Sequence, residues 1–409
     1  MHAIITVGLG FGDEGKGATV DFLARHHGAD LIVRYCGGAQ AGHNVQLPDG
    51  RRHTFSQFGA GVFAGARTYL GSRVIINPAT LVPEAEHLAE LGIADPPSWL
   101  TVHPSCLVST LFHVAMNRLR ETARGDARHG SCGLGIGETR HYWLRYGSDA
   151  VTASDLRHRC GLIEKLTLLR DRFLLEMQSL DRVDQGQADL LYRAAPELEA
   201  DLLIDAMEGV TYSPDLPAAK TAIFEGSQGV LLDESFGFHP YTTWSTVTTR
   251  HAIEMLDDAG VESFETVGLT RAYSTRHGAG PFPTRCAEMT AHIHDRGNPE
   301  NDWQGAIQAG PLDLVLLRYA SEVNSIDALV VNHLDELPKE PTFCKHYADA
   351  DTLAIPRRMA EQQSLTDRLL RVEPKIEAAT REGLLAELSR IAPVVIVGNG
   401  PTHTDRTFV

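Results

Sequence analysis

The sequence lacks the features that mark secreted, membrane-spanning and disordered proteins. Its six cysteines include no CxxC pair, which excludes close-set zinc ligands and favours a reducing cytoplasm over a disulfide framework. No apolar run reaches membrane length, and the first residues carry no basic segment typical of a secretory signal. Since 43% of the 409 residues are hydrophobic, the chain can bury a large core. We therefore expect a soluble cytoplasmic protein with no membrane partner.

Positive charge is scarce. The chain has 37 Lys and Arg residues against 53 Asp and Glu residues, which gives a formal net charge of −16. A protein that binds along a nucleic-acid backbone needs the opposite balance. This composition excludes a general nucleic-acid partner, but it leaves room for a local basic pocket that binds one nucleotide.

Flexible linkers and repeats are absent as well, because the chain has no Gly/Ser tract, charge block or repeated period. We predict one large domain over residues 1–409, with a helical insertion at about 160–210. Short apolar runs alternate with helical patterns, which favours an α/β fold with a mostly parallel, doubly wound sheet. The predicted strands are residues 3–9, 31–34, 221–224, 265–269, 328–331 and 393–397, and the predicted helices include residues 78–91, 312–323 and 376–391.

A glycine-rich loop follows the first predicted strand. Gly10, four further residues and then Gly-Lys (Lys16) have the spacing of a phosphate loop, in which backbone amides and the lysine hold phosphate oxygens. The loop departs from that pattern because Gly17 stands where Ser or Thr usually holds magnesium, and because it contains two acids. Carboxylates repel phosphate, so Asp13 is predicted to bind a metal ion or to take a proton from a substrate. The alternative is a tight glycine turn with a surface carboxylate.

A second nucleotide signal lies near residue 335. Asn332 and Asp335 have the Asn-x-x-Asp spacing of a guanine-reading motif, in which the aspartate accepts hydrogen bonds from the guanine N1–H and exocyclic amine. The alternative is a purely structural turn, because Asn and Asp often form turns at strand ends. The pair Gly400 and Pro401 follows the last predicted strand and either walls a base pocket or forms a turn.

Five segments resemble, in order and spacing, the signature segments of adenylosuccinate synthetases. They are GDEGKG at 12–17, RYCGGAQAGH at 34–43, FEGSQGVLLD at 224–233, AYSTRHGAGPFPT at 272–284 and GPTHTDRT at 400–407. The resemblance implies a P-loop-like GTP-binding ligase architecture and a homodimer. It also implies a GTP- and Mg²⁺-dependent activity that phosphorylates the 6-oxygen of IMP and displaces the phosphate with the amino group of aspartate, giving adenylosuccinate and GDP.

The resemblance further implies roles for individual residues. Asp13 would remove the purine N1 proton and bind Mg²⁺, His43 would support transfer of the γ-phosphoryl group, and the Gly42 carbonyl would add a metal contact. The expected GTP-binding residues are Gly12, Glu14, Gly15, Lys16, Gly17, Asp335, Gly398, Gly400 and Pro401. The expected binding residues for the substrate nucleotide are Asp13, Gln40, Ser131, Cys132, Arg145, Gln228, Thr243 and Arg276, with Arg145 near the arginine that the family donates across its homodimer.

Three segments depart from the family pattern. The family's GGHNAGHT reads GGAQAGHN at 37–44, where Gln40 and Asn44 are polar replacements. A phosphate-binding Thr-Thr-Gly-Arg reads Ser-Cys-Gly-Leu at 131–134, and the arginine-rich loop that holds aspartate reads NDWQGAIQAG at 301–310. Since dicarboxylates are usually held by arginine forks, activation of a 6-oxopurine nucleotide is better supported than aspartate as the amine. One alternative is a specialised homologue that uses another purine-like nucleotide or amine in modified-nucleotide biosynthesis. Another is a non-catalytic GTP-binding regulator, which the retention of Asp13 and His43 disfavours.

Overall fold

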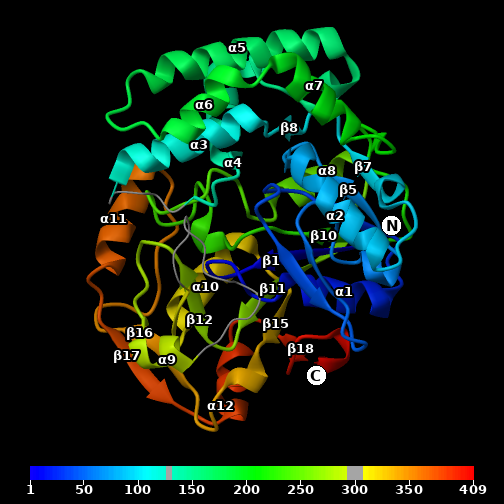
Figure 1. Cartoon of the computed structure of the whole chain (residues 1–409). Coiled ribbons are helices and arrows are strands. Elements are labelled where there is room, and N and C mark those ends of the chain that lie inside the picture. Colours follow the sequence, from blue (N-terminus) through cyan, green and yellow to red (C-terminus); the bar gives the residue numbers. More distant parts are fainter. Residues whose placement is uncertain (126–130, 293–306) are drawn as a thin grey trace.

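The computed structural model describes residues 1–125, 131–292 and 307–409. Its centre is a ten-stranded sheet in the order β19-β18-β15-β11-β1-β10-β2-β5-β7-β9 (Figure 1). Neighbouring strands are parallel except for β18 and β19. The strands are β1 (His2–Gly8), β2 (Leu31–Arg34), β5 (Arg67–Leu70), β7 (Leu100–Val102), β9 (Thr211–Tyr212), β10 (Thr221–Glu225), β11 (Phe264–Arg271), β15 (Ala328–Asn332), β18 (Val394–Gly398) and β19 (Arg406–Phe408). The six predicted strands are all present, and the mostly parallel α/β fold is confirmed.

Strand β1 shows why helices cover both faces of this sheet. All of its residues except the first are buried, and successive side chains point to opposite faces. Ile4 packs in a core with residues of α1 (Lys16–His27), whereas Ile5 packs in a core with residues of α8 (Arg250–Asp258). A strand buried on both faces needs a continuous apolar run, which is the pattern that predicted it.

Helices connect and cover the strands, and short ribbons complete the fold. The other helices are α2 (Pro78–Glu90), α3 (Leu111–Arg124), α4 (Ile136–Tyr146), α5 (Arg159–Met177), α6 (Gln185–Arg193), α7 (Pro196–Asp205), α9 (Ala287–His292), α10 (Leu314–Asn324), α11 (Met359–Leu369) and α12 (Arg381–Leu388). The 3₁₀ helices are η1 (Val62–Ala64), η2 (Pro96–Trp99), η4 (Gly147–Asp149), η5 (Ala153–Arg157), η6 (Val230–Leu232), η7 (Leu334–Glu336) and η8 (His403–Asp405). The smaller sheets pair β3 (His43–Gln46) with β4 (Arg52–Phe55), β6 (Ile75–Ile76) with β8 (Leu107–Val108), β12 (Ser274–His277) with β13 (Ile307–Gly310), and β16 (Thr342–Tyr347) with both β14 (Leu312–Asp313) and β17 (Pro374–Ala378).

Two predicted helices are shorter than the sequence pattern suggested. The helix predicted at 312–323 begins at residue 314, because Asp313 caps it by accepting from the amides of Val315 and Leu316. The helix predicted at 376–391 is wrong in its first part, since Ile376 lies in β17 and pairs with β16. Helix α12 starts only after Thr380, whose hydroxyl accepts from the amide of Gly383 at 3.1 Å. A side-chain cap therefore sets each helix start.

The segment predicted as a helical insertion forms α5, α6 and α7, which lie over α3 and α4 at one end of the molecule (Figure 1). Helix α5 buries Leu162, Leu166, Leu169 and Phe173, which recur at helical spacing, and its charged residues lie on the other faces. The assignment of residues 1–409 to one domain stays a prediction. No helix within the described ranges is long and apolar enough to span a membrane.

The cap of α10 predicts a pH-dependent stability. Asp313 is buried and also accepts from the Tyr347 hydroxyl at 2.8 Å, and burial raises its pKa from 3.8 to about 6. Because the folded state binds this proton more tightly, the stability it contributes is complete below the unfolded pKa and is lost as pH rises through about 6. Relative to Asp313→Asn, the native protein should lose up to about 3 kcal/mol of unfolding free energy between acidic and neutral pH. Urea unfolding at both pH values measures this, and parallel pH profiles would contradict it.

Candidate active site

The loop between β1 and α1 is an anion-binding turn. Gly12 and Gly15 have φ angles of 95° and 78°, which glycine adopts at no steric cost. The amides of Gly10 and Gly12 donate to Glu14 Oε1 at 3.0 and 2.8 Å, and Lys16 Nζ lies 2.6 Å from Glu14 Oε2. The amides and the lysine therefore hold the carboxylate of Glu14 in the place that suits a phosphate group.

Asn332, the last residue of β15, ties this loop to the sheet. It is fully buried, and its Nδ2 donates to the carbonyl oxygen of Glu14 at 2.8 Å and to the hydroxyl of Thr19 at 3.1 Å. Gly398 ends the adjacent strand β18, and a Cβ there would lie 2.5 Å from Asn332 Oδ1. Gly398 thus packs behind the phosphate loop, and its contact with GTP stays a prediction.

Gly17, which stands where phosphate loops have Ser or Thr, has no room for a side chain. A Cβ there would lie 2.6 Å from the carbonyl oxygen of Asn44 and 2.9 Å from the carbonyl carbon of His43. Helix α1 therefore packs directly on the backbone of β3. This close approach brings His43 to the start of α1, beside the phosphate loop.

Replacing Gly17 by serine should therefore destabilise the fold instead of improving metal binding. The new side chain must move α1 away from β3, which should cost about 1–3 kcal/mol of unfolding free energy in a urea titration. Gly161→Ala in α5 is the matched control, because a Cβ there meets no atom within 4 Å. The control should be neutral or slightly stabilising. A Gly17→Ser variant as stable as the native protein would contradict the packing argument.

Asp13 stands at the tip of the loop, and the ends of β11 and β12 hold it. Its Oδ2 lies 3.3 Å from Nε2 of His277, and its carbonyl oxygen accepts from Arg271 Nε at 2.5 Å. Burial by itself would raise the pKa of this carboxyl, but the contact with His277 and the charges of Arg271 and Lys16 hold it at about 2. Asp13 is therefore ionised, which suits it to bind a cation. The sequence analysis did not assign Arg271 or His277 to the catalytic group.

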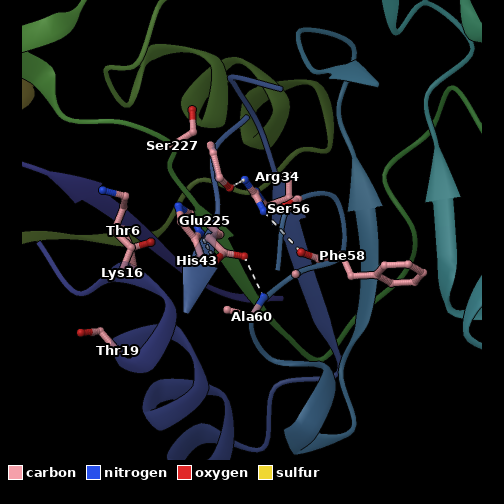
Figure 2. Close-up of polar contacts among 12 residues, drawn as sticks. Thr6, Lys16, Thr19, Arg34, His43, Ser56, Phe58, Ala60, Glu225 and Ser227 are labelled. Atoms are coloured by element: carbon pink, nitrogen blue, oxygen red, sulfur yellow. Dashed lines mark hydrogen bonds and ion pairs between the residues drawn. The ribbon is translucent and has the colours of Figure 1, made fainter. Parts of the chain in front are cut away.

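His43, at the start of β3, is paired with a buried acid that the sequence analysis missed. Its Nδ1 lies 2.5 Å from Oε1 of Glu225, the last residue of β10, and Glu225 Oε2 accepts from the amide of Ala60 at 3.0 Å (Figure 2). Burial lowers the pKa of His43, whereas the contact with His43, the charge of Arg34 and the amide of Ala60 lower the pKa of the Glu225 carboxyl despite its burial. The pair is thus a neutral imidazole donating to a carboxylate. His43 Nε2 is buried and has no hydrogen-bond partner among the described residues, so it is the ring atom left for a ligand.

A buried guanidinium supports this pair from the next strand. Arg34, the last residue of β2, is opposite Glu225 in the strand register and is 2% exposed. Its Nη1 and Nη2 donate to the carbonyl oxygens of Phe58 and Ala41 at 3.3 and 3.2 Å, as Figure 2 shows for Phe58. Arg34 therefore contributes positive charge beside Glu225 and fixes the loop that leads to His43.

The predicted guanine-reading residues gather at the ends of β15 and β18. Asp335 lies exposed in η7, and its charge acts on Arg406 of β19. Arg406 is buried, which lowers its pKa to about 10, and its Nη1 donates to the carbonyl oxygens of Thr402 and Gly400 at 2.7 and 3.3 Å. The segment with Gly400 and Pro401 is therefore anchored close to Asp335. Guanine reading by these residues stays a prediction.

Three of the residues predicted for the substrate nucleotide have features that the structure describes, and their roles stay predictions. Gln228 has a left-handed φ of 57°, and its carbonyl oxygen would lie 2.8 Å from a Cβ at Gly8. Gln40 Oε1 is buried without a hydrogen-bond partner in the described part of the chain. Thr243 is fixed through its backbone, because its amide donates to the carbonyl of Leu232 at 2.7 Å.

The other predicted residues have different partners in this structure. Arg276 is 2% exposed and uses its guanidinium to bind the carbonyl oxygens of its own loop, residues 279 and 281, while stacking over the ring of Phe11. Arg145 is exposed and pairs with Glu176 at 2.7 Å. The Ser131 hydroxyl accepts from Asn117, and burial raises the pKa of the neighbouring Cys132 thiol. Their roles in nucleotide binding stay predictions.

The segment that replaces the arginine-rich loop lies partly outside the described residues. Residues 301–306 are not described, whereas Ile307–Gly310 form β13 and pair with β12. In that register Gln308 is opposite Arg276. The structure therefore brings the end of this segment next to a predicted substrate residue.

Comparisons with known proteins bear on the family of this chain. A family model described as adenylosuccinate synthetase matches residues 5–380. An adenylosuccinate synthetase of Pseudomonas fluorescens (strain SBW25) is 35% identical over 358 residues, which cover 85% of this chain and 81% of that protein. Another, from P. fluorescens strain Pf-5, is 32% identical over 433 aligned positions, which cover 98% of this chain and 97% of that protein.

Solved structures show the same fold. The fully ligated adenylosuccinate synthetase of Plasmodium falciparum has a TM-score of 0.78 at 20% identity and covers all of both chains. The succinoaminodeoxyadenylate synthetase of cyanophage S-2L, bound to dGMP and dATP, has a TM-score of 0.60 at 19% identity and covers 100% of this chain and 95% of that one. With the matching family model and relatives above 30% identity, these likenesses show that the chain belongs to the adenylosuccinate synthetase family and is a carbon–nitrogen ligase.

Proposed function

We propose that the chain joins aspartate to carbon 6 of IMP, with GTP as the co-substrate, to give adenylosuccinate, GDP and phosphate. The observation that carries this proposal is the His43–Glu225 pair beside the phosphate loop. A module that only binds GTP has no need for a buried imidazole whose Nδ1 is fixed by a carboxylate and whose Nε2 has no partner among the described residues. Two functional groups, Asp13 and His43, therefore support catalysis over simple binding.

The proposed reaction has two steps. Asp13 accepts the N1 proton of the purine, the electron pair moves to the 6-oxygen, and that oxygen attacks the γ-phosphorus of GTP while GDP leaves. The amine then attacks carbon 6, phosphate leaves with the electron pair of the C–O bond, and the departing phosphate takes the proton that the amine nitrogen loses. His43 meets the transferring phosphoryl group through Nε2, and Lys16 with the loop amides stabilises the developing charge on the GDP side. Phosphorylation is needed because an oxo group is a poor leaving group.

The residues present fit a magnesium ion. Asp13 offers an ionised carboxylate, and Gly42 offers a carbonyl oxygen just before β3, so the donors are the oxygen ligands that Mg²⁺ prefers. No group of three or more His, Cys, Asp or Glu residues able to hold a metal occurs in the described ranges. This agrees with a Mg²⁺ ion that also uses phosphate oxygens of the nucleotide. When bound, the ion neutralises phosphate charge next to the acids of the loop.

Recognition of GTP, homodimerisation and a cytoplasmic location belong to the same proposal. In this proposal Asp335, whose charge acts on Arg406 beside the loop at 400–401, accepts from guanine. Arg145 is 54% exposed on α4 and could reach a second copy of the chain after releasing Glu176. All six cysteines are free thiols, which suits a reducing compartment.

A second candidate is a specialised ligase with another nucleotide or amine. The loss of positive charge at residues 131–134 and 301–310 favours it. So do the hydrogen bonds that the Arg276 guanidinium donates to carbonyl oxygens of its own loop. The cyanophage neighbour, bound to dGMP, shows that this fold accommodates another 6-oxopurine nucleotide. In this case GTP still activates the 6-oxygen, but the nucleotide substrate or the amine differs.

Mass spectrometry of one reaction mixture tests the proposal. The mixture contains the protein, Mg²⁺, GTP, IMP and aspartate, and IMP and aspartate are each omitted in turn. Adenylosuccinate formed together with GDP supports the proposed function. GDP release that needs IMP but gives no adduct supports the second candidate through a different amine. Slow GTP hydrolysis that depends on no nucleotide substrate would mean that the chain is a GTP-binding regulator.

A further inference from the structure

Two neighbours fix the orientation of Asp13. Arg271, which ends β11, binds its backbone carbonyl, and His277, which ends β12, contacts its carboxylate at Oδ2. Asp13 also has a left-handed φ of 64°, which a residue with a side chain keeps only when its surroundings hold it there. The direction of the carboxylate is therefore set by the fold before any substrate binds.

The contact between Asp13 and His277 lies where a ligand can reach it. The two side chains are 25% and 17% exposed, respectively. His277 is paired in the β12–β13 ribbon with Ile307, and the chain turns away immediately afterwards at Gly278, which has a φ of 74°. The ring is thus held on a ribbon next to the phosphate loop, and its Nε2 is the atom that meets Asp13.

The chemistry of 6-oxopurines gives this contact a consequence. On the edge of the base that carries N1, hypoxanthine has a single hydrogen-bond donor, N1–H. Guanine adds an amino group on the adjacent carbon 2. A carboxylate can accept N1–H and the 2-amino group in parallel, one with each oxygen. While His277 engages Oδ2, a 2-amino group must share that oxygen with the imidazole, which already takes one of its two lone-pair directions.

We propose that His277 makes this site selective for a 6-oxopurine nucleotide without a 2-amino group, because it engages Asp13 Oδ2. The inference rests on the proposed function, in which Asp13 meets the purine N1–H. A 2-amino group and the imidazole then compete for the same oxygen, and their N–H groups crowd each other there, so the hydrogen bond of at least one donor is weakened. Weakened or lost polar contacts of this kind let a site discriminate between closely similar substrates. His277 is thus a positioning residue that also determines specificity.

The test compares IMP with GMP as nucleotide substrates, using GDP release from GTP, followed for each protein at several nucleotide concentrations. The native protein should prefer IMP in kcat/KM by about 10²-fold or more. His277→Ala should reduce that preference by about tenfold or more, by improving kcat/KM for GMP relative to IMP. His277→Gln, whose amide reaches the place of Nε2, should keep most of the preference. Damage to the fold alone would lower both rates together and leave their ratio unchanged.

His251→Ala is the matched control, because His251 also contacts a carboxylate, that of Glu254 at 2.9 Å, but does so on α8. It should leave the ratio unchanged. A native protein that uses GMP as well as IMP overturns the inference even if no variant folds, and so does an unchanged ratio in a folded His277→Ala. If IMP gives GDP and adduct but the ratio does not respond, the proposed function stands and only the role of His277 fails. If neither nucleotide stimulates GDP release, both fail.

Discussion

Asp13→Asn is expected to lower kcat with GTP, IMP and aspartate by about 10²- to 10⁴-fold, because an amide cannot accept the purine N1 proton. The variant keeps the size of the side chain, and asparagine tolerates the left-handed φ of 64° at this position. Its backbone carbonyl can still accept from Arg271. The phosphate loop should therefore keep its shape, and GTP should still bind. Single-turnover rates and calorimetric titration with GTP measure the two effects separately.

Asp201→Asn is the matched control for the Asp13 variant. Asp201 is also a carboxylate paired with a cation, Arg159 at 2.6 Å, but both side chains are about half exposed on the helices α5 and α7. Exposed pairs of this kind contribute little, so this change should leave turnover and stability almost unaltered. An Asp13→Asn variant whose kcat is close to that of the native protein would contradict the assignment of Asp13 as the base.

The strands of the central sheet could be predicted because they are buried on both faces. Segments such as Ala328–Asn332 have no polar face, so their apolar residues run together in the sequence. The strand near the end of the chain was harder to predict, because residues 374–378 lie in an edge strand whose exposed residues do not form an apolar run. Only the capping hydroxyl of Thr380 separates that strand from α12, and a single cap is a weak signal beside a long leucine-rich pattern.

Three of the missed site residues, Arg34, Glu225 and Arg271, share one position in the fold. Each is buried and is the last residue of a parallel strand, as is Asn332, which the sequence analysis named only as part of a guanine-reading motif. The register places Arg34 opposite Glu225 and Arg271 opposite Asn332. Since the carboxyl ends of parallel strands meet at one edge, a polar residue ending an apolar run signals a site. That signal was in the sequence, and the predicted strand at 221–224 stopped one residue before Glu225.

The contacts between these residues could not be read from the sequence. His43 and Glu225 are 182 positions apart in the sequence, and Asp13 and His277 lie even further apart. Motif order places such residues in one protein, but it does not say which carboxylate faces which imidazole. The close packing of α1 on β3 at Gly17 decides the first pairing, and the turn of the β12–β13 ribbon decides the second.

Glu225→Gln should be almost as damaging to turnover as loss of the catalytic base, although Glu225 touches no substrate in the proposed mechanism. Both of its partners, His43 Nδ1 and the amide of Ala60, donate to it, and each uses a different carboxylate oxygen. A glutamine has only one oxygen, so its NH₂ group must face one of the two donors. Facing His43, it forces the imidazole into the other tautomer; facing Ala60, it leaves a buried amide unsatisfied at a cost of about 1–3 kcal/mol.

The expected result for Glu225→Gln is a fall in kcat of about 10²- to 10⁴-fold with little change in GTP affinity, since a histidine held in the wrong tautomer loses its catalytic role. Glu254→Gln is the matched control, because Glu254 also pairs with a histidine at 2.9 Å, but at the surface on α8. It should behave as the native protein. His43→Gln combined with Glu225→Gln should lose far less than the product of the two single effects, because the acid acts through the imidazole. Multiplicative effects would instead mean that Glu225 serves the fold independently of His43, and the buried pair would then be no part of the catalytic machinery.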